Sequence, residues 1–109
     1  MQTSLFQTEI DWSQSVHLKE NNPESQAHLN ANRKRWSAQN ELIFKAMERG
    51  ERPNNYDSKV FNPATGQYQR IGHLPKRIEE IRKHIEEENL ECEVKDRWMD
   101  TVRFKEYFL

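Results

Sequence analysis

A regular stripe of large apolar residues constrains the fold of this chain more than any other feature of its sequence. The stripe recurs at spacings of four, three and four residues and consists of Leu74, Ile78, Ile81 and Ile85. Because an α-helix repeats about every 3.6 residues, this spacing places all four side chains on one helix face. Pro75 suits the first turn, where its missing N–H needs no partner. The sequence therefore predicts a helix that buries one face in a core.

Cations gather at the start of this predicted helix and just ahead of it. They are Arg70, Lys76, Arg77, Arg82 and Lys83, with His73 close by. Such cations can contact the phosphates and base edges of DNA, and Glu80 could accept a hydrogen bond from a cytosine amine. The pattern predicts a helix that reads duplex DNA. The competing interpretation is an ordinary solvated face, on which Glu79 and Glu80 pair with Lys83 and His84 one turn later.

Two alternating runs follow the predicted helix. In residues 90–95, Leu90, Cys92 and Val94 alternate with charged residues, which is typical of a strand with one buried face. Residues 96–100 can turn the chain, and a second alternating run leads to Leu109. The sequence therefore predicts a β-hairpin that closes the domain. Lys95 and Arg97 lie near its predicted tip, where cations can contact DNA.

A long helix is predicted before these elements, from about residue 27 to residue 49. This stretch lacks proline and glycine, and Gly50 suits the end of a helix. Three consecutive cations, Arg33 to Arg35, form a second basic cluster on it. Consecutive helical residues point in different directions, so only one or two of these cations can contact a DNA backbone at the same time. The candidates are Arg33 and Arg35.

The stretch between the two long predicted helices has two interpretations. In the first, Asn54 or Asn55 caps a short helix that runs through Tyr56 to about Phe61. In the second, residues 59–61 pair with residues 68–70 as a small hairpin around the Asn62–Gly66 turn, which removes the short helix.

The segment from Trp36 to Leu109 resembles small winged helix-turn-helix proteins of phages and bacterial mobile elements. The matching places are Gly50-Glu51, where the first helix ends, and the run Leu74-Pro75-Lys76-Arg77-Ile78-Glu79-Glu80-Ile81-Arg82. The resemblance implies a mostly α fold with a C-terminal β-hairpin, namely three helices plus a wing. It also implies sequence-specific binding to double-stranded DNA in the transcription regulation or replication of a phage or mobile element. The third helix would enter the major groove, while the first helix and the wing hold the backbone.

Charge and polarity divide the chain. Residues 1–27 are polar and are predicted to form a flexible tail, which leaves residues 28–109 as the folded domain. The net charge is −1, but residues 33–85 hold twelve Lys or Arg against six Asp or Glu, so this middle part carries +6 between acidic ends. Apolar residues make up only 34% of the chain, which predicts a modest core.

The N-terminal tail contains a short pattern with a different implication. Gln2, Leu5 and Phe6 form a Gln-x-x-Leu-Phe sequence, which resembles the peptide by which bacterial replication proteins dock on the sliding clamp. This resemblance implies an alternative function, a protein-interaction adaptor. In the competing interpretation, Leu5, Phe6, Ile10 and Trp12 fold back onto the domain.

Several other classes of function find no support in the sequence. A single cysteine, Cys92, excludes an internal disulfide, and four histidines show no metal-ligand spacing, so no metal or cofactor is expected. We find no phosphate-binding loop or nucleophile motif and expect no enzyme. No apolar run approaches the ~20 residues of a membrane span, and we expect a cytoplasmic protein. Proteins of the resembled class are commonly homodimers, but the sequence names no interface.

Overall fold

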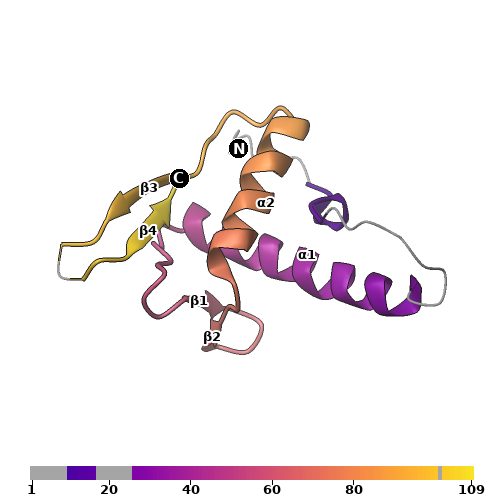
Figure 1. The fold of residues 1–109 in the computed structure, drawn as a ribbon, viewed down its shortest axis with the longest axis horizontal. Coiled ribbons are helices and arrows are strands. Elements are labelled where there is room, and N and C mark those ends of the chain that lie inside the picture. The colour runs from indigo at the N-terminus through magenta and orange to yellow at the C-terminus, as the bar shows by residue number, and fades with distance from the viewer. Residues whose placement is uncertain (1–9, 17–25, 101) are drawn as a thin grey trace, which may run out of the picture.

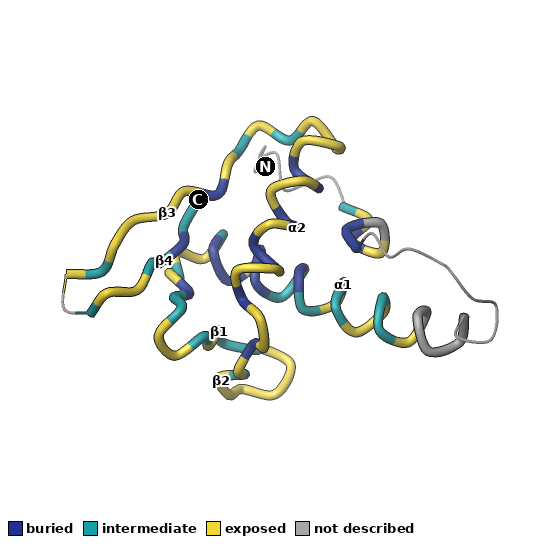
Figure 2. The backbone as a smooth tube through the Cα atoms, in the orientation of Figure 1, coloured by how far each residue is buried: buried dark blue, intermediate teal, exposed yellow. Residues whose placement is uncertain are grey.

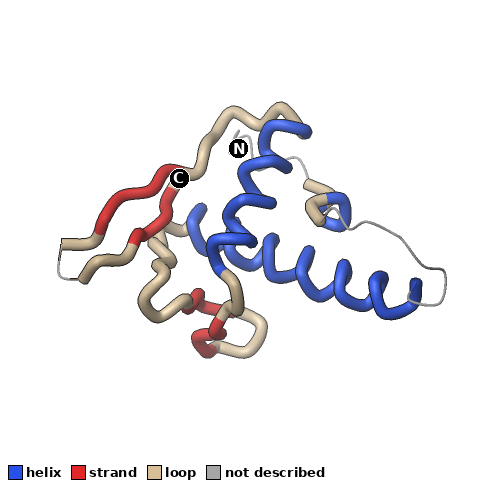
Figure 3. The backbone as a smooth tube through the Cα atoms, in the orientation of Figure 1, coloured by secondary structure: helices blue, strands red, loops and turns tan. Residues whose placement is uncertain are grey.

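The computed structural model describes residues 10–16, 26–100 and 102–109. A short 3-10 helix, η1 (Trp12–Gln14), precedes the long helix α1 (Gln26–Glu48), and the second α-helix, α2 (Leu74–Glu87), crosses α1 (Figure 1). Two antiparallel hairpins flank α2 in the sequence (Figure 3). The first pairs β1 (Lys59–Asn62) with β2 (Gln67–Arg70), and the second pairs β3 (Lys95–Trp98) with β4 (Lys105–Phe108).

The two predicted long helices and the C-terminal hairpin are confirmed. α1 ends where the sequence predicted, because Gly50 adopts a φ of +94°, which side chains with a Cβ rarely adopt. The amide of Gly50 then donates to the carbonyl of Met47, and that of Glu51 to the carbonyl of Ala46, each at 3.0 Å. These two bonds form the Schellman motif that satisfies the last carbonyls of a helix.

The predicted short helix at residues 56–61 is wrong, and the alternative hairpin is what forms. Asn54 does act as a cap, since its side-chain oxygen accepts from the amides of Tyr56 and Asp57. The turn that it caps ends at Ser58, whose φ of +53° cannot continue an α-helix. The chain enters β1 there, and Val60 becomes fully buried.

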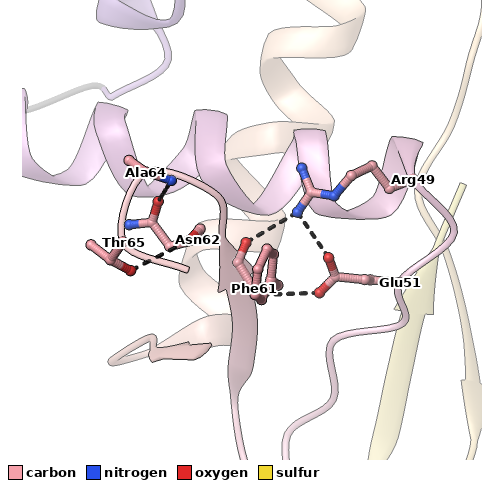
Figure 4. Close-up of polar contacts among 6 residues, drawn as sticks. All are labelled: Arg49, Glu51, Phe61, Asn62, Ala64 and Thr65. Carbon is pink, nitrogen blue, oxygen red and sulfur yellow. Dashed lines mark hydrogen bonds and ion pairs between the residues drawn. The ribbon is translucent and has the colours of Figure 1, made fainter. Parts of the chain in front are cut away.

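Polar contacts with the end of α1 fix the first hairpin in place (Figure 4). The carboxylate of Glu51 accepts from the amide of Phe61 at 3.0 Å, and Arg49 donates to the Phe61 carbonyl at 3.0 Å and to Glu51 at 2.8 Å. In the turn, the side chain of Asn62 accepts from the amide of Ala64. On the outer edge of β1, the backbone amide and carbonyl of Phe61 are therefore satisfied by the side chains of Glu51 and Arg49, which follow α1 in the chain.

The core lies between α1 and α2, where buried segments of the two helices meet (Figure 2). The predicted stripe is confirmed, because Leu74, Ile78, Ile81 and Ile85 are each no more than 6% exposed. They pack in one cluster with residues from other elements: Trp12, Ile43, Phe44, Ala46, Met47, Val60, Ile71, Val94 and Tyr107. This burial fixes which face of α2 remains in solvent.

The first strand of the C-terminal hairpin begins later than the alternating run predicted. Residues 90–94 are irregular, although Val94 is buried and Leu90 and Cys92 pack against the core. The backbone at Val94 is bound by a side chain, since both Nε and Nη2 of Arg82 donate to the Val94 carbonyl, at 3.2 and 3.0 Å. Strand pairing therefore starts at Lys95, so Lys95 and Arg97 lie within β3 and not at the tip of the hairpin.

Part of the predicted N-terminal tail packs on the domain. Trp12, Ser15 and Val16 are buried, and Ile10 packs against the core. The ring of Trp12 lies 4.9 Å from the rings of both Phe44 and His84, and so bridges α1 and α2. For Ile10 and Trp12 the fold-back interpretation is confirmed, whereas Gln2, Leu5 and Phe6 lie outside the described residues.

Candidate nucleic-acid interface

The outward face of α2 carries two lysines in one row. Lys76 and Lys83 are seven residues apart, which is about two helical turns, and both are exposed. Lys76 lies 3.9 Å from Glu79, and these side chains are 58% and 74% exposed, so their pairing is weak. Lys83 makes no ion pair within the described part of the chain. Both charges are therefore available to an anionic partner.

Two further cations meet just ahead of α2. Arg70, predicted as a DNA contact, lies directly opposite Lys59 in the β1–β2 register. The neighbouring pair is hydrogen-bonded, since the Ile71 amide donates to the Ser58 carbonyl at 2.7 Å. Lys59 and Arg70 are therefore a non-hydrogen-bonded pair, whose side chains lie close together. Two like charges placed opposite each other are destabilising unless an anion lies between them.

Lys59 is a candidate residue that the preferred sequence interpretation missed. The interpretation with a short helix left it without a partner, whereas the alternative hairpin already placed it near Arg70. His73 completes this end of α2. It is exposed, adopts a φ of +55° and makes no capping hydrogen bond with its side chain. Pro75 has no amide hydrogen, and the amides of Lys76 and Arg77 donate to the His73 carbonyl at 3.0 and 3.2 Å. The start of α2 therefore offers the positive end of the helix dipole, with Arg70 and His73 beside it in the chain.

The predictions that Arg77 and Glu80 contact DNA are wrong, because both side chains are buried. Arg77 is 4% exposed and Glu80 is 7% exposed, and Nη1 of Arg77 lies 3.2 Å from Oε1 of Glu80. The guanidinium also lies 4.9 Å above the Trp36 ring of α1. Burial lowers the pKa of Arg77, and the charge of Glu80 opposes that change. The two residues bind each other between the helices.

A buried polar cluster extends from this ion pair to the N-terminal segment. Nδ2 of Asn40 donates to Glu80 at 3.2 Å and to the hydroxyl of Ser15 at 3.0 Å. The Ser15 hydroxyl in turn donates to the Trp12 carbonyl at 2.6 Å. His84 is also buried, at 1% exposed, so the surface pairing considered between Glu80 and His84 does not form. This cluster connects η1, α1 and α2.

Arg35 of the α1 basic cluster shares an aromatic partner with Arg77 of α2. Its guanidinium is 5.6 Å from the Trp36 ring, the same ring that Arg77 contacts, and its charge helps to lower the pKa of Arg77. Arg35 is exposed and donates to Asn32 at 3.1 Å, whereas Arg33 is half-buried. The structure therefore brings Arg35, rather than the whole cluster, toward α2.

Lys95 and Arg97 lie on a different surface from the α2 lysines. The side chain of the intervening residue, Asp96, points toward α2, where it accepts from Arg82 at 2.8 Å. Because side chains alternate along a strand, Lys95 and Arg97 project from the opposite face of β3. Arg97 binds Glu106 there at 2.6 Å. These two predicted contacts are therefore not grouped with those of α2.

Other kinds of site find no support among the described residues. In this part of the chain no group of three His, Cys, Asp or Glu side chains could hold a metal ion. Burial raises the pKa of the half-buried Cys92 thiol, which disfavours the reactive thiolate. The helices described here include none that could cross a membrane.

Comparison with known proteins gives no relative on which to base a function. No protein-family model, curated protein or solved structure shows a significant match to this chain. The function must therefore be argued from the residues themselves.

Proposed function

We propose that this chain is a winged helix-turn-helix protein that binds double-stranded DNA through the outward face of α2. The observation that carries this proposal is the row of Lys76 and Lys83 on the face opposite the buried isoleucine stripe. A helix that presents cations in one row, anchored by its other face, can lie in the major groove. The β3–β4 hairpin after α2 takes the place of the wing in this class.

The end of α2 that enters the groove is its N-terminal end. Arg70, His73 and Lys76 are at this end, whereas Glu86 and Glu87 are at the other. The partial positive charge of a helix N-terminus favours phosphate in the same place. The opposed cations Lys59 and Arg70 add a position where a phosphate relieves repulsion between like charges.

Arg77 and Glu80 support DNA binding indirectly in this proposal. Their buried ion pair fixes α2 against Trp36 of α1, so Lys76, on the helix face opposite the buried stripe, points outward. Arg35 lies above the same Trp36 ring and can contact the DNA backbone beside the helix. Sequence specificity would then come from His73, which is exposed at the tip of α2, while Lys76 and Lys83 contact phosphates.

Replacing Lys76 and Lys83 together by alanine tests the proposal. Each phosphate contact contributes about 0.9 to the slope of log affinity against log salt concentration, so the double variant should lose about 1.8 from the slope. At 0.1 M salt the affinity should fall by roughly tenfold to a hundredfold. Fluorescence anisotropy of a labelled blunt duplex, titrated at several salt concentrations, measures both quantities.

Two control variants separate this effect from a general loss of charge. Lys45→Ala removes a cation from α1 that already pairs with Glu41 at 2.9 Å, and it should leave the slope unchanged. Glu79→Gln removes the acid beside Lys76 and should raise the affinity. A double variant with the wild-type salt slope would show that α2 does not contact the phosphates.

A further inference from the structure

A third extended segment lies along the free edge of β4. The amide of Asn55 donates to the carbonyl of Lys105 at 2.9 Å, and the amide of Tyr107 donates to the carbonyl of Pro53 at 2.8 Å. Asn54 and Glu106 face each other between these two bonds as an antiparallel bridge. The C-terminal hairpin is thus extended into a small three-stranded arrangement, with β4 in the middle.

One face of this arrangement points away from the core, and we call it the outer sheet face. The register places three side chains in each of three rows: Arg52, Phe108 and Lys95; Asn54, Glu106 and Arg97; and Tyr56, Phe104 and Met99. The opposite face is the inner one, where Pro53 and Tyr107 are buried and Asn55 donates to the Tyr107 hydroxyl at 2.9 Å. Alternation along each strand separates the two faces.

Contacts between neighbouring side chains confirm these rows. The guanidinium of Arg52 lies 4.4 Å above the Phe108 ring, and the rings of Tyr56 and Phe104 are 5.5 Å apart. Glu106 in the middle row accepts from Arg97 at 2.6 Å and from Arg52 at 3.3 Å. The outer sheet face is therefore a continuous surface built from residues far apart in the sequence.

The outer sheet face combines exposed aromatic rings with a positive charge. Tyr56 is 62% exposed and Phe104 is 41% exposed, an unusual position for two touching rings. The face contains three cations and one acid, Glu106. The cations are Arg52, Lys95 and Arg97. The hydrogen bond from Arg97, with a smaller contribution from Arg52, lowers the pKa of Glu106, so this carboxylate is ionised and neutralised within the face.

We propose that the outer sheet face binds single-stranded nucleic acid, with bases stacked on Tyr56 and Phe104 and phosphates held by Arg52, Lys95 and Arg97. Unpaired bases have free faces that stack on exposed rings, whereas the bases of a duplex are already stacked on one another. The two rings are inclined at 57°, so each presents its own surface to a separate base. The excess of cations favours a polyanion over a protein partner, whose contact core would be poor in charge.

This binding is separate from the proposed contact of α2 with duplex DNA. Lys95 and Arg97 project from β3 on the side opposite Asp96, and Asp96 is the residue that binds Arg82 of α2. Arg52 lies on the same outer face, in the segment along the other edge of β4. Variants on the two surfaces should therefore affect different ligands. The two proposals can fail independently.

Binding of a labelled twelve-nucleotide oligothymidylate to the full chain, followed by fluorescence anisotropy, tests the inference. Tyr56→Leu keeps an apolar side chain but removes the ring, and it should weaken binding between about fivefold and a hundredfold. Tyr56→Phe keeps the ring and should bind like the wild type. Tyr68→Leu is the matched control, because Tyr68 is 66% exposed but lies on β2, outside the outer sheet face.

Measuring the affinity of each variant for the duplex as well as for the oligothymidylate distinguishes the two surfaces. Tyr56→Leu should leave duplex affinity unchanged, and the Lys76→Ala, Lys83→Ala double variant should leave oligothymidylate affinity unchanged. The inference is overturned if the wild-type chain does not bind the oligothymidylate, or if Tyr56→Leu binds it as tightly as the wild type does. It is also overturned if the α2 double variant loses as much of this binding as Tyr56→Leu.

Discussion

Arg77→Ala is expected to lower the free energy of unfolding by about 3 to 5 kcal/mol, because it removes one partner of a buried ion pair. The Glu80 carboxylate, 7% exposed, would keep only the hydrogen bond from Asn40 at 3.2 Å. The ring of Trp36 would also lose the guanidinium that now lies 4.9 Å above it. Urea denaturation followed by circular dichroism measures the change.

Lys76→Ala is the matched control for this variant. Lys76 is the preceding residue on the same helix, but its side chain is 58% exposed, so its loss should change stability by no more than about 0.5 kcal/mol. A double variant, Arg77→Met with Glu80→Gln, removes both charges and should recover most of the loss. A loss below about 1 kcal/mol in Arg77→Ala would show that the ion pair is not buried as described.

Trp12→Ala should cost a similar amount, about 3 to 5 kcal/mol of unfolding free energy. Trp12 is 5% exposed and fills the space between Phe44 and His84, with each pair of ring centres 4.9 Å apart. Its removal would leave a cavity at the junction of α1 and α2. It would also let water reach the Ser15 and Asn40 hydrogen bond, now fully buried.

Trp98→Ala provides the comparison for Trp12→Ala, since it deletes the same side chain from an exposed position. Trp98 is 63% exposed, and its described partner is the ammonium of Lys105 at 5.4 Å from the ring. Its removal should cost less than about 1 kcal/mol. If the two tryptophan variants have equal urea midpoints, η1 contributes nothing to stability and the fold-back of residues 10–16 would be refuted.

The elements predicted well from the sequence are those with a strong local signal. The isoleucine stripe defines α2 by its period alone, and Gly50 marks the end of α1 because few other residues adopt its φ of +94°. The first hairpin was ambiguous, because Asn54 binds the amides of Tyr56 and Asp57 equally well as a helix cap and as a turn. The long-range contacts of Glu51 and Arg49 with Phe61 favour the hairpin.

The candidate site was predicted in part. The apolar stripe showed which face of α2 is buried, but its period did not show how wide that face is. Arg77 and Glu80 border the stripe. They are buried because Arg77 packs on the Trp36 ring of α1 and Glu80 accepts a hydrogen bond from Asn40 of α1. Both partners are distant in the sequence. Pro53 carries no strand signal, so the segment that builds the third strand of the outer sheet face could not be predicted locally.

The side-chain contacts at Phe61 bear on the behaviour of the protein at high concentration. An open strand edge offers donors and acceptors on which a strand of a second molecule can pair, which is a route to fibres. Here Glu51 and Arg49 already occupy the amide and the carbonyl in the middle of β1. A strand from a second molecule would have to break both bonds before pairing with β1, so this edge of the hairpin is protected against growth by strand addition.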